Sequence, residues 1–176
     1  MADYVKLRRN LSKIKSNIRA RIRQNETLLK YLLYDDSDPL SHPITEDQID
    51  VMFREVLNGE PIELSKQKVF RTQFVRRSDN ETGSQLRIFT HSTKKTNEFQ
   101  YDVRIGADII THTDIDVINN ENRSDILFAL VCDCLDGFDV EVAAPLEVVK
   151  NWSIEFMEYK TNYIGVRVIF NTTVAV

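Results

Sequence analysis

The stretch Phe99-Gln100-Tyr101-Asp102-Val103-Arg104-Ile105-Gly106-Ala107-Asp108-Ile109 decides the expected fold, because it is the longest run in the chain with a period of two residues. Its odd-numbered positions are apolar, and its even-numbered positions are polar or glycine. Successive side chains of a β-strand point to opposite faces of a sheet, so the pattern predicts a strand with one buried and one solvent-exposed face. Pairing shifted by one residue would bury Asp102, Arg104 and Asp108, and the register should therefore be well defined.

Shorter alternating segments on either side of this strand predict two β-hairpins. Val69–Val75 and Gln85–Thr90 flank the polar connector Ser78–Gly83. Towards the end of the chain, Trp152–Phe156 and Val166–Asn171 alternate in the same way, with a turn between them. We expect antiparallel pairing within each hairpin.

The first 23 residues, which we call the basic arm, predict a helix of about five turns. An apolar residue recurs every three or four positions, at Leu7, Leu11, Ile14, Ile18 and Ile22. This spacing places one apolar stripe along the helix, with the basic residues on its other faces.

Capping residues predict two further helices after the arm. Asn25 is suited to be the N-cap of a short helix over residues 26–33. Thr45, with Gln48 three positions later, forms a capping box for a helix expected to run through Leu57. The Asn-Gly pair that follows Leu57 would end this helix, since glycine tolerates the left-handed conformation found at helix C-termini.

The order of elements predicts the fold class. Ser124 is suited to cap a helix over Ser124–Asp136, so the order is three helices, three strands, one helix and two strands. This order predicts an α+β fold: N-terminal helices followed by an antiparallel sheet of about five strands, with one helix packed on it. We divide the chain into a helical segment with the basic arm, residues 1–57, and an α+β body, residues 58–176, expected to form one compact unit.

The composition is that of a globular domain. The chain has 176 residues, of which 42% are hydrophobic and 28% charged, and this length can bury a substantial core. Its apolar runs are too short to span a bilayer, and no apolar segment follows the basic N-terminus as in a signal peptide. We expect an intracellular protein with no membrane partner.

The net charge of −4 conceals a strong asymmetry. The arm contains eight of the 23 Lys and Arg residues but only one of the 27 Asp and Glu residues. The arm therefore carries about +7 and the rest of the chain about −11. Any function assigned to the protein should explain a basic arm on an acidic body.

Three interpretations of the arm remain open at this stage: a helix docked on its own chain, a contact with another subunit or partner, and binding to nucleic acid. Eight cations would neutralise several phosphates and give salt-sensitive affinity for nucleic acid. Tyr4 is the only aromatic residue in the arm, which disfavours base stacking. The candidate subunit or partner interface consists of the apolar stripe, four arginines of the arm and two of the polar loop at 76–84: Leu7, Leu11, Ile14, Ile18, Ile22, Arg8, Arg9, Arg19, Arg23, Arg76 and Arg77.

No catalytic, cofactor-binding or metal-binding motif appears in the sequence, and we predict that the protein is not an enzyme. There is no Gly-rich phosphate loop and no Gly-x-Ser-x-Gly elbow. His112 has Asp108, Asp114 and Asp116 as neighbours, and these four side chains could in principle bind a divalent metal ion. Alternation would place all four on the solvent-exposed face in any case, so we favour a solvated strand end over a metal site.

The two cysteines, Cys132 and Cys134, lie two residues apart in a predicted helix, so they point to different faces and should not pair. A zinc site would need further ligands. We expect both to be free, small apolar residues in a reducing compartment.

Two segments resemble structural proteins from the neck of tailed bacteriophages. They are Tyr101–Ile115, followed by Arg123 and Ile126 in a helix, and Asn25–Asp35, which leads into Asp38-Pro39-Leu40-Ser41. The similarity is greatest to tail-terminator and head-to-tail joining proteins, and it covers about two-thirds of the chain.

This resemblance implies a non-enzymatic virion protein without cofactors, which forms a homo-oligomeric ring, often a hexamer, that terminates the tail and joins it to the head. Its partners would be further copies of itself, neighbouring connector and tail-tube proteins and, in some arrangements, packaged DNA. It would be found in the virion neck and, during assembly, in the host cytoplasm. On this hypothesis, deletion of residues 1–23 should leave a folded body and weaken assembly. The alternative is a nucleic-acid-binding accessory protein that uses the arm.

Overall fold

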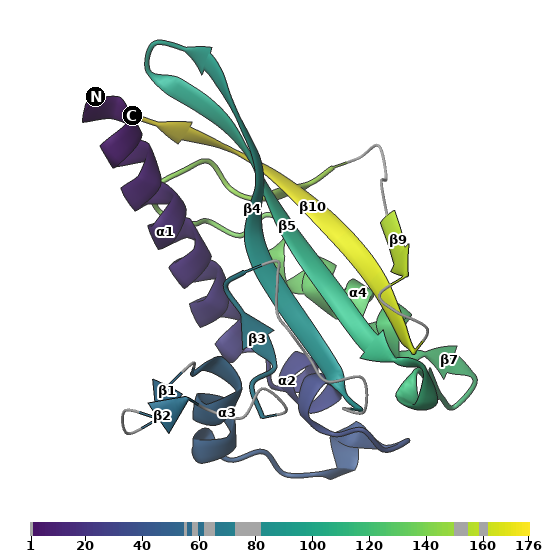
Figure 1. The fold of residues 1–176 in the computed structure, drawn as a ribbon. Coiled ribbons are helices and arrows are strands. Elements are labelled where there is room, and N and C mark those ends of the chain that lie inside the picture. The colour runs from purple at the N-terminus through teal and green to yellow at the C-terminus, as the bar shows by residue number, and fades with distance from the viewer. Residues whose placement is uncertain are drawn as a thin grey trace.

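The computed structural model describes residues 2–54, 56–57, 60–61, 66–72, 82–149, 155–158 and 162–176. A six-stranded sheet forms the centre of this part of the chain, with the strand order β3-β4-β5-β10-β8, while β9 pairs with β10 beside β8 (Figure 1). The strands are β3 (Val69–Phe70), β4 (Ser84–Asn97), β5 (Gln100–His112), β8 (Glu147–Val148), β9 (Glu155–Glu158) and β10 (Tyr163–Ala175). All pairs except β3–β4 are antiparallel.

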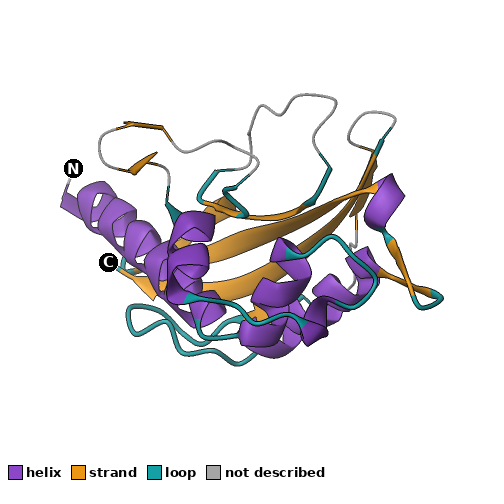
Figure 2. Ribbon diagram, turned by 90° about the horizontal axis from the view of Figure 1, so that it is seen from below, coloured by secondary structure: helices purple, strands orange, loops and turns teal. Residues whose placement is uncertain are grey.

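The helices lie on one face of the sheet (Figure 2). They are α1 (Ala2–Arg23), α2 (Glu26–Leu33), α3 (Glu46–Phe53) and α4 (Arg123–Leu135), with the short 3-10 helices η1 (Pro39–Ser41) and η2 (Thr113–Ile115). Two small strand pairs complete the description: β1 (Val56–Leu57) with β2 (Glu60–Pro61), and β6 (Val117–Ile118) with β7 (Glu121–Asn122). The α+β prediction, with N-terminal helices and a mostly antiparallel sheet, is confirmed.

One hydrophobic core fills the space between the helices and the sheet. It combines the apolar residues of α1, α2 and α4 with the odd-numbered residues of β5 from Tyr101 to Ile109 and with Val168, Phe170 and Val174 of β10. The helices and the sheet therefore share one core.

The apolar stripe of α1 forms part of this core. Ile14, Ile18 and Ile22 are fully buried, Leu7 is 6% exposed and Leu11 is partly buried. The periodicity predicted the helix and its inward face correctly. Of the three interpretations of the arm, docking on its own chain is the one that the structure shows.

The caps of α2 and α3 are confirmed, but α3 is shorter than predicted. The side chain of Asn25 accepts a hydrogen bond from the Leu28 amide at 3.0 Å, and Thr45 and Gln48 form both halves of the capping box. The prediction that this helix runs through Leu57 is wrong: it ends at Phe53, and Arg54 takes up an extended conformation with ψ 143°. Val56–Leu57 instead pairs with β2, and Asn58-Gly59 lies outside the described residues, in the connection between these strands. An Asn-Gly pair is as typical of a two-residue hairpin loop as of a helix end, so the signal was ambiguous.

The first predicted hairpin is also wrong in the part that is described. Val69 and Phe70 pair with Leu86 and Arg87 in parallel, which a hairpin cannot do. Most of the expected connector and residues 73–75 lie outside the described residues. The hairpin that β4 does form is with β5, through the turn at Glu98-Phe99. The second half of β4 is exposed on both faces, so it lacks the apolar alternation by which a strand is recognised.

The remaining elements follow the prediction closely. The helix α4 begins one residue early: Asn122 is the N-cap, and Ser124 lies in the first turn, where its amide donates to Asp116 Oδ1 at 2.9 Å. The helix stops before Gly137, whose φ of 73° suits glycine. The antiparallel pairing of β9 with β10 agrees with the second predicted hairpin, while Trp152 and Ile154 lie outside the described residues.

Candidate functional site

The face of the sheet opposite the helices, which we call the second face, carries a series of charged side chains. Along β5 it presents Asp102, Arg104, Gly106 and Asp108. The sequence predicted that all four are solvent-exposed, and this is wrong for half of them. Asp102 and Arg104 are exposed, whereas Gly106 and Asp108 are buried.

The buried half of the second face is organised around an ion pair between neighbouring strands. Arg167 of β10 lies opposite Asp108 and donates from Nε to Oδ1 at 2.6 Å and from Nη2 to Oδ2 at 2.9 Å. Asp108 is fully buried and Arg167 is 6% exposed. Arg87 of β4 lies opposite Asp108 on its other side, so charges of alternating sign cross three strands. A bidentate buried pair is geometrically specific, so it favours this register over its alternatives.

The next cross-strand pair on the second face consists of a glycine on β5 and an aromatic residue on β4. Phe89 lies opposite Gly106, and the Arg167 guanidinium lies 5.2 Å from the centre of the Phe89 ring. A Cβ atom at Gly106 would lie 2.5 Å from Cζ of Phe89. Glycine is therefore needed here for the ring to lie across β5.

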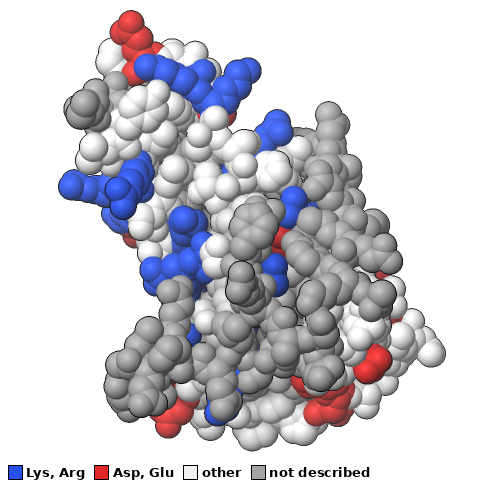
Figure 3. Space-filling model, in the orientation of Figure 1, with Lys and Arg blue, Asp and Glu red and all other residues white. Residues whose placement is uncertain are grey.

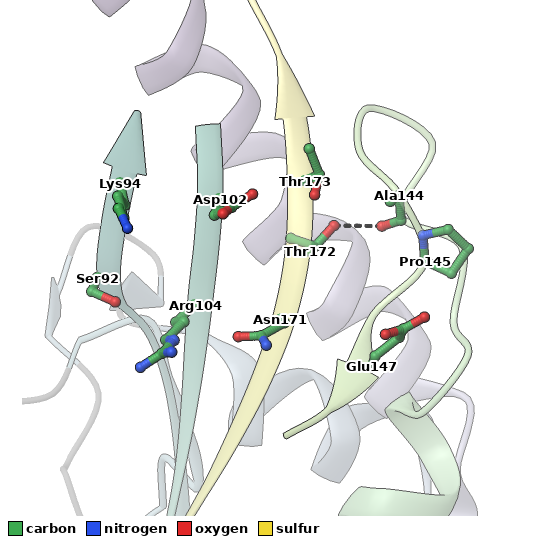
Figure 4. A pocket seen from close by; sticks show the side chains of 10 residues that line it. All are labelled: Ser92, Lys94, Asp102, Arg104, Ala144, Pro145, Glu147, Asn171, Thr172 and Thr173. Carbon is green, nitrogen blue, oxygen red and sulfur yellow. Dashed lines mark hydrogen bonds between the residues drawn. The ribbon is translucent and has the colours of Figure 1, made fainter. Parts of the chain in front are cut away.

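Towards the β4–β5 turn, the second face opens into a polar groove of about 570 Å³ (Figure 4). Its floor consists of two cross-strand rows: Lys94 opposite Asp102 and then Thr173, and Ser92 opposite Arg104 and then Asn171. Ala144, Pro145, Glu147 and Thr172 complete the lining, and the Thr172 hydroxyl donates to the Ala144 carbonyl.

The groove offers hydrogen-bond donors and acceptors and charges of both signs, but no histidine or cysteine. Two cations, Lys94 and Arg104, and two carboxylates, Asp102 and Glu147, line it (Figure 4).

His112 and its acidic neighbours do not form the solvated cluster that the sequence predicted. Asp108 is bound to Arg167, and Asp116 is buried at the start of α4, where it accepts from the Ser124 amide. His112 is 5% exposed, packs edge-on against Tyr163 and accepts from the Asp114 amide at its Nδ1. In the part of the chain that the structure describes, no three His, Cys, Asp or Glu residues are placed to hold a metal ion.

Most of the candidate interface residues in the basic arm are occupied within the chain. The apolar stripe is in the core, so a neighbouring subunit cannot use it as it stands, and the prediction that this stripe is a subunit contact is wrong. Arg19 is buried, donates to the Phe53 carbonyl and stacks on the Phe53 ring. Arg23 binds Asp50 at 2.6 Å and Glu46 at 3.0 Å.

Arg8 and Arg9 are the two candidate residues that the structure describes as exposed. Arg76 and Arg77 lie outside the described residues. The expectation that the body stays folded without residues 1–23 stays a prediction, and the core argues against it, because that deletion would remove Ile14, Ile18 and Ile22 from the core.

A family model named YomW matches residues 25–172, which is most of the chain. The protein belongs to the YomW family. No curated protein matches it. The match begins just after α1 and includes α2, α4 and nearly all of the sheet. None of the described helices is long and apolar enough to cross a membrane.

Within the region matched by YomW, Arg123 is buried; the sequence resemblance includes it only as part of the helix that follows Tyr101–Ile115 and assigns it no contacts. Its guanidinium is fully buried and donates to four backbone carbonyls, those of Ile115, Tyr31, Tyr34 and Asp36, at 2.6 to 2.9 Å. Burial lowers its pKa, although the nearby carboxylates of Asp35 and Asp36 act in the opposite direction. Arg123 thus ties the end of α2 and the following loop to the start of α4. No local sequence signal marks this role, because its partners are backbone atoms far away in the chain.

The two cysteines of this YomW-family chain are free, as predicted. Burial is the main cause that raises the pKa of the Cys132 thiol, to about 11, and burial also raises the pKa of Cys134. Because the thiolate is the nucleophile, neither residue is activated for catalysis at neutral pH.

Proposed function

We propose that this YomW-family protein is a non-enzymatic structural component of the neck of a tailed phage, where copies of it form a ring that terminates the tail and joins it to the head. Three kinds of support exist for this proposal. The sequence segments quoted above resemble tail-terminator and joining proteins, the name YomW is of the type used for proteins of SPβ-like phages, and the order of helices and strands suits such proteins.

The observation that carries the proposal is the projecting end of the β4–β5 hairpin. In Figure 1 the tip of the hairpin extends past the start of α1, while β10 lies beside β5 as far as the pair Ala175–Gln100. Residues 91–100 are all exposed, and among the described strands this part of β4 pairs only with β5. Ordering such a segment costs conformational entropy that little burial offsets within one subunit. A neighbouring subunit that packs against it would supply the missing burial.

The described polar clusters agree with a structural role. The Asp108–Arg167 pair and Arg123 hold elements of the fold together, so these buried polar groups have a structural role. The proposal therefore needs no cofactor and no reaction step.

The particle that the purified protein forms is the direct test. A single chain has a mass of 20.5 kDa. We expect light scattering after gel filtration to give one closed multiple of this mass, and negative-stain electron microscopy to show rings with a central opening. A protein that stays monomeric at about 100 μM, well above the working range of a specific assembly, would contradict the proposal.

Binding to nucleic acid is a second candidate function, because α1 exposes Lys6, Arg8 and Arg9 on its outer side. Phosphate contacts by Lys and Arg weaken steeply with salt. An electrophoretic shift titration with double-stranded DNA at 50 and 200 mM salt tests this function. Salt-sensitive binding that Arg8→Ala and Arg9→Ala weaken would favour it, whereas no shift at the lower salt concentration would eliminate it.

A further inference from the structure

One end of the molecule is strongly basic. The start of α1 and the projecting part of the β4–β5 hairpin lie side by side there, and the ring of Tyr4 packs 6.5 Å from that of Tyr101. Residues 4–10 and 90–104 expose six cations and only two carboxylates, Glu98 and Asp102. We call the surface of these cations the basic end: Lys6, Arg8, Arg9, Lys94, Lys95 and Arg104.

The opposite end is acidic. It is built from residues 34–41, which follow α2, and residues 112–125, and the side chain of Asn119 joins the two segments by donating to the Ser37 carbonyl. The only Lys or Arg in these two segments is Arg123, which is fully buried. We call the surface of the exposed carboxylates the acidic end: Asp36, Asp38, Asp114, Glu121 and Asp125.

The two ends are separated by the length of β5. This strand has 13 residues, so it spans about 40 Å at about 3.3 Å per residue. Figure 3 shows most of the visible Lys and Arg over the upper part of the molecule, with some Asp or Glu atoms at its very top, and further Asp and Glu near its lower edge. Attraction between the ends within one subunit is weak at this distance, because it is several times the Debye length of about 8 Å at physiological salt.

Exposed apolar side chains divide between the same two ends. Tyr4, Val5 and Phe99, which are 62 to 69% exposed, lie at the basic end. Leu40 and Val117, 48% and 70% exposed, lie at the acidic end. Each end thus exposes apolar side chains together with an excess of charge of one sign, and the excess at one end is opposite in sign to that at the other.

We infer that copies of this chain join head to tail, with the basic end of one subunit bound to the acidic end of the next. This inference rests on the proposed self-assembly and names the surfaces that carry it. The contact is heterologous, since two different surfaces meet, and such a contact gives a ring if the rotation between subunits closes. It leaves the buried stripe of α1 in place and uses only side chains that a single subunit exposes.

Charge reversal at each end, followed by mixing, tests the inference. The first variant carries Lys6→Glu, Arg9→Glu and Lys94→Glu at the basic end. The second carries Asp38→Lys, Asp114→Lys and Glu121→Lys at the acidic end. Asp133→Lys serves as the control, because Asp133 is exposed on α4 about 15 Å along the helix from its first residues.

We expect each triple variant alone to be monomeric where the wild-type protein is assembled, with association weakened at least about tenfold, and the control to assemble normally. An equimolar mixture of the two triple variants should regain the oligomer, because each reversed end then faces an end of opposite charge. Recovery in the mixture also shows that both variants are folded.

The outcomes separate this inference from the function on which it rests. If the wild-type protein assembles and both triple variants form the same particle, the head-to-tail contact is overturned while the ring stands. If the wild-type protein assembles and each variant is monomeric and folded by circular dichroism, but the mixture stays monomeric, the pairing of the basic end with the acidic end is overturned while the ring stands. A wild-type protein that is itself monomeric overturns both the contact and the ring.

Discussion

Asp108 is the residue on which the pairing of β5 with β10 depends most directly. It is fully buried and accepts both hydrogen bonds of the Arg167 fork. Asp108→Asn keeps the shape but removes the buried carboxylate charge that pairs with the Arg167 guanidinium. We expect a loss of about 3–5 kcal/mol in the free energy of unfolding, measured by urea denaturation.

Asp102 supplies the matched control for this substitution. It lies on the same strand and the same face, but it is exposed. Asp102→Asn should change the free energy of unfolding by less than about 0.5 kcal/mol. Equal losses for the two variants would show that the buried pair has no special role in stability.

Arg123 is predicted to be irreplaceable by lysine. Its planar guanidinium donates to four carbonyls from two separate segments, and a single ammonium cannot reach all of them. Arg123→Lys should therefore lower the free energy of unfolding by about 2–4 kcal/mol, because buried carbonyls lose their donors. The conservative change Arg104→Lys, at an exposed position, should be close to neutral in the same urea titration, and a similar loss at both positions would count against the argument.

The pH dependence of stability should carry the signature of Cys132. Its thiol has a pKa raised from 9.0 to about 11 in the folded chain, chiefly by burial. Between these values the unfolded chain has lost the proton that the folded chain still holds, so stability falls as pH rises. The contribution is fully present below pH 9 and is lost as the pH rises to about 11.

Urea midpoints measured from pH 8 to 11 test this expectation. The Cys132→Ala variant should lose less stability than the wild-type protein over the upper part of that range. Parallel curves for the two proteins would exclude Cys132 as a cause.

At the scale of single elements, α1 is expected to be indispensable for folding. Ile18 is fully buried in the shared core, so Ile18→Ala should cost about 2–5 kcal/mol in the free energy of unfolding. Val5, on the same helix, is 62% exposed, and Val5→Ala should be nearly neutral. Thermal unfolding followed by circular dichroism compares the two. A small effect at Ile18 would show that α1 is only loosely docked.

Elements with a clear amphipathic pattern could be predicted from the sequence, and elements without one could not. The stripe of α1, the caps at Asn25 and Thr45 and the alternation in β5 all report local physics, and the structure follows them. The second half of β4 has no buried face, and the parallel pairing of Val69–Phe70 depends on long-range topology. Neither the second half of β4 nor this parallel pairing produces a pattern in the nearby sequence.

The burial of Asp108 and Arg167 on the second face could not be predicted from the sequence either. Arg167 and Asp108 are 59 residues apart in sequence, so their pairing appears only when β5 and β10 are placed side by side. For the same reason the sequence assigned the apolar stripe of α1 to a possible neighbour. A stripe predicts that something covers it, but not whether the cover comes from the same chain.

At the scale of the whole molecule, the charge asymmetry survives in a different form. The sequence located it between an arm and a body, whereas the structure places six exposed cations of α1 and of the β4–β5 hairpin, with two carboxylates, at one end and a cluster of exposed carboxylates at the other. The basic end therefore combines residues of α1 with residues of the β4–β5 hairpin. The sequence predicted only the cations of α1.

The end of the β4–β5 hairpin can be shortened with the loss of only two residue pairs between β5 and β10, Tyr101–Val174 and Gln100–Ala175, and this gives the last prediction. Lys94 and Asp102 lie directly opposite each other, so replacing residues 95–101 with Asn-Gly joins them by a two-residue turn. The body should stay folded, because the core from Val103 onwards is untouched. Assembly should be weakened if the proposed contact is correct, because Lys95 and the exposed Phe99 are removed from the basic end, and light scattering should show a shift towards the monomer mass. Tyr101→Ala in the intact hairpin is the control, since it removes the one ring of the replaced segment that is buried, at 4% exposure, but keeps the hairpin tip. A shortened protein that assembles as tightly as the wild-type protein would show that the hairpin tip is not part of the contact.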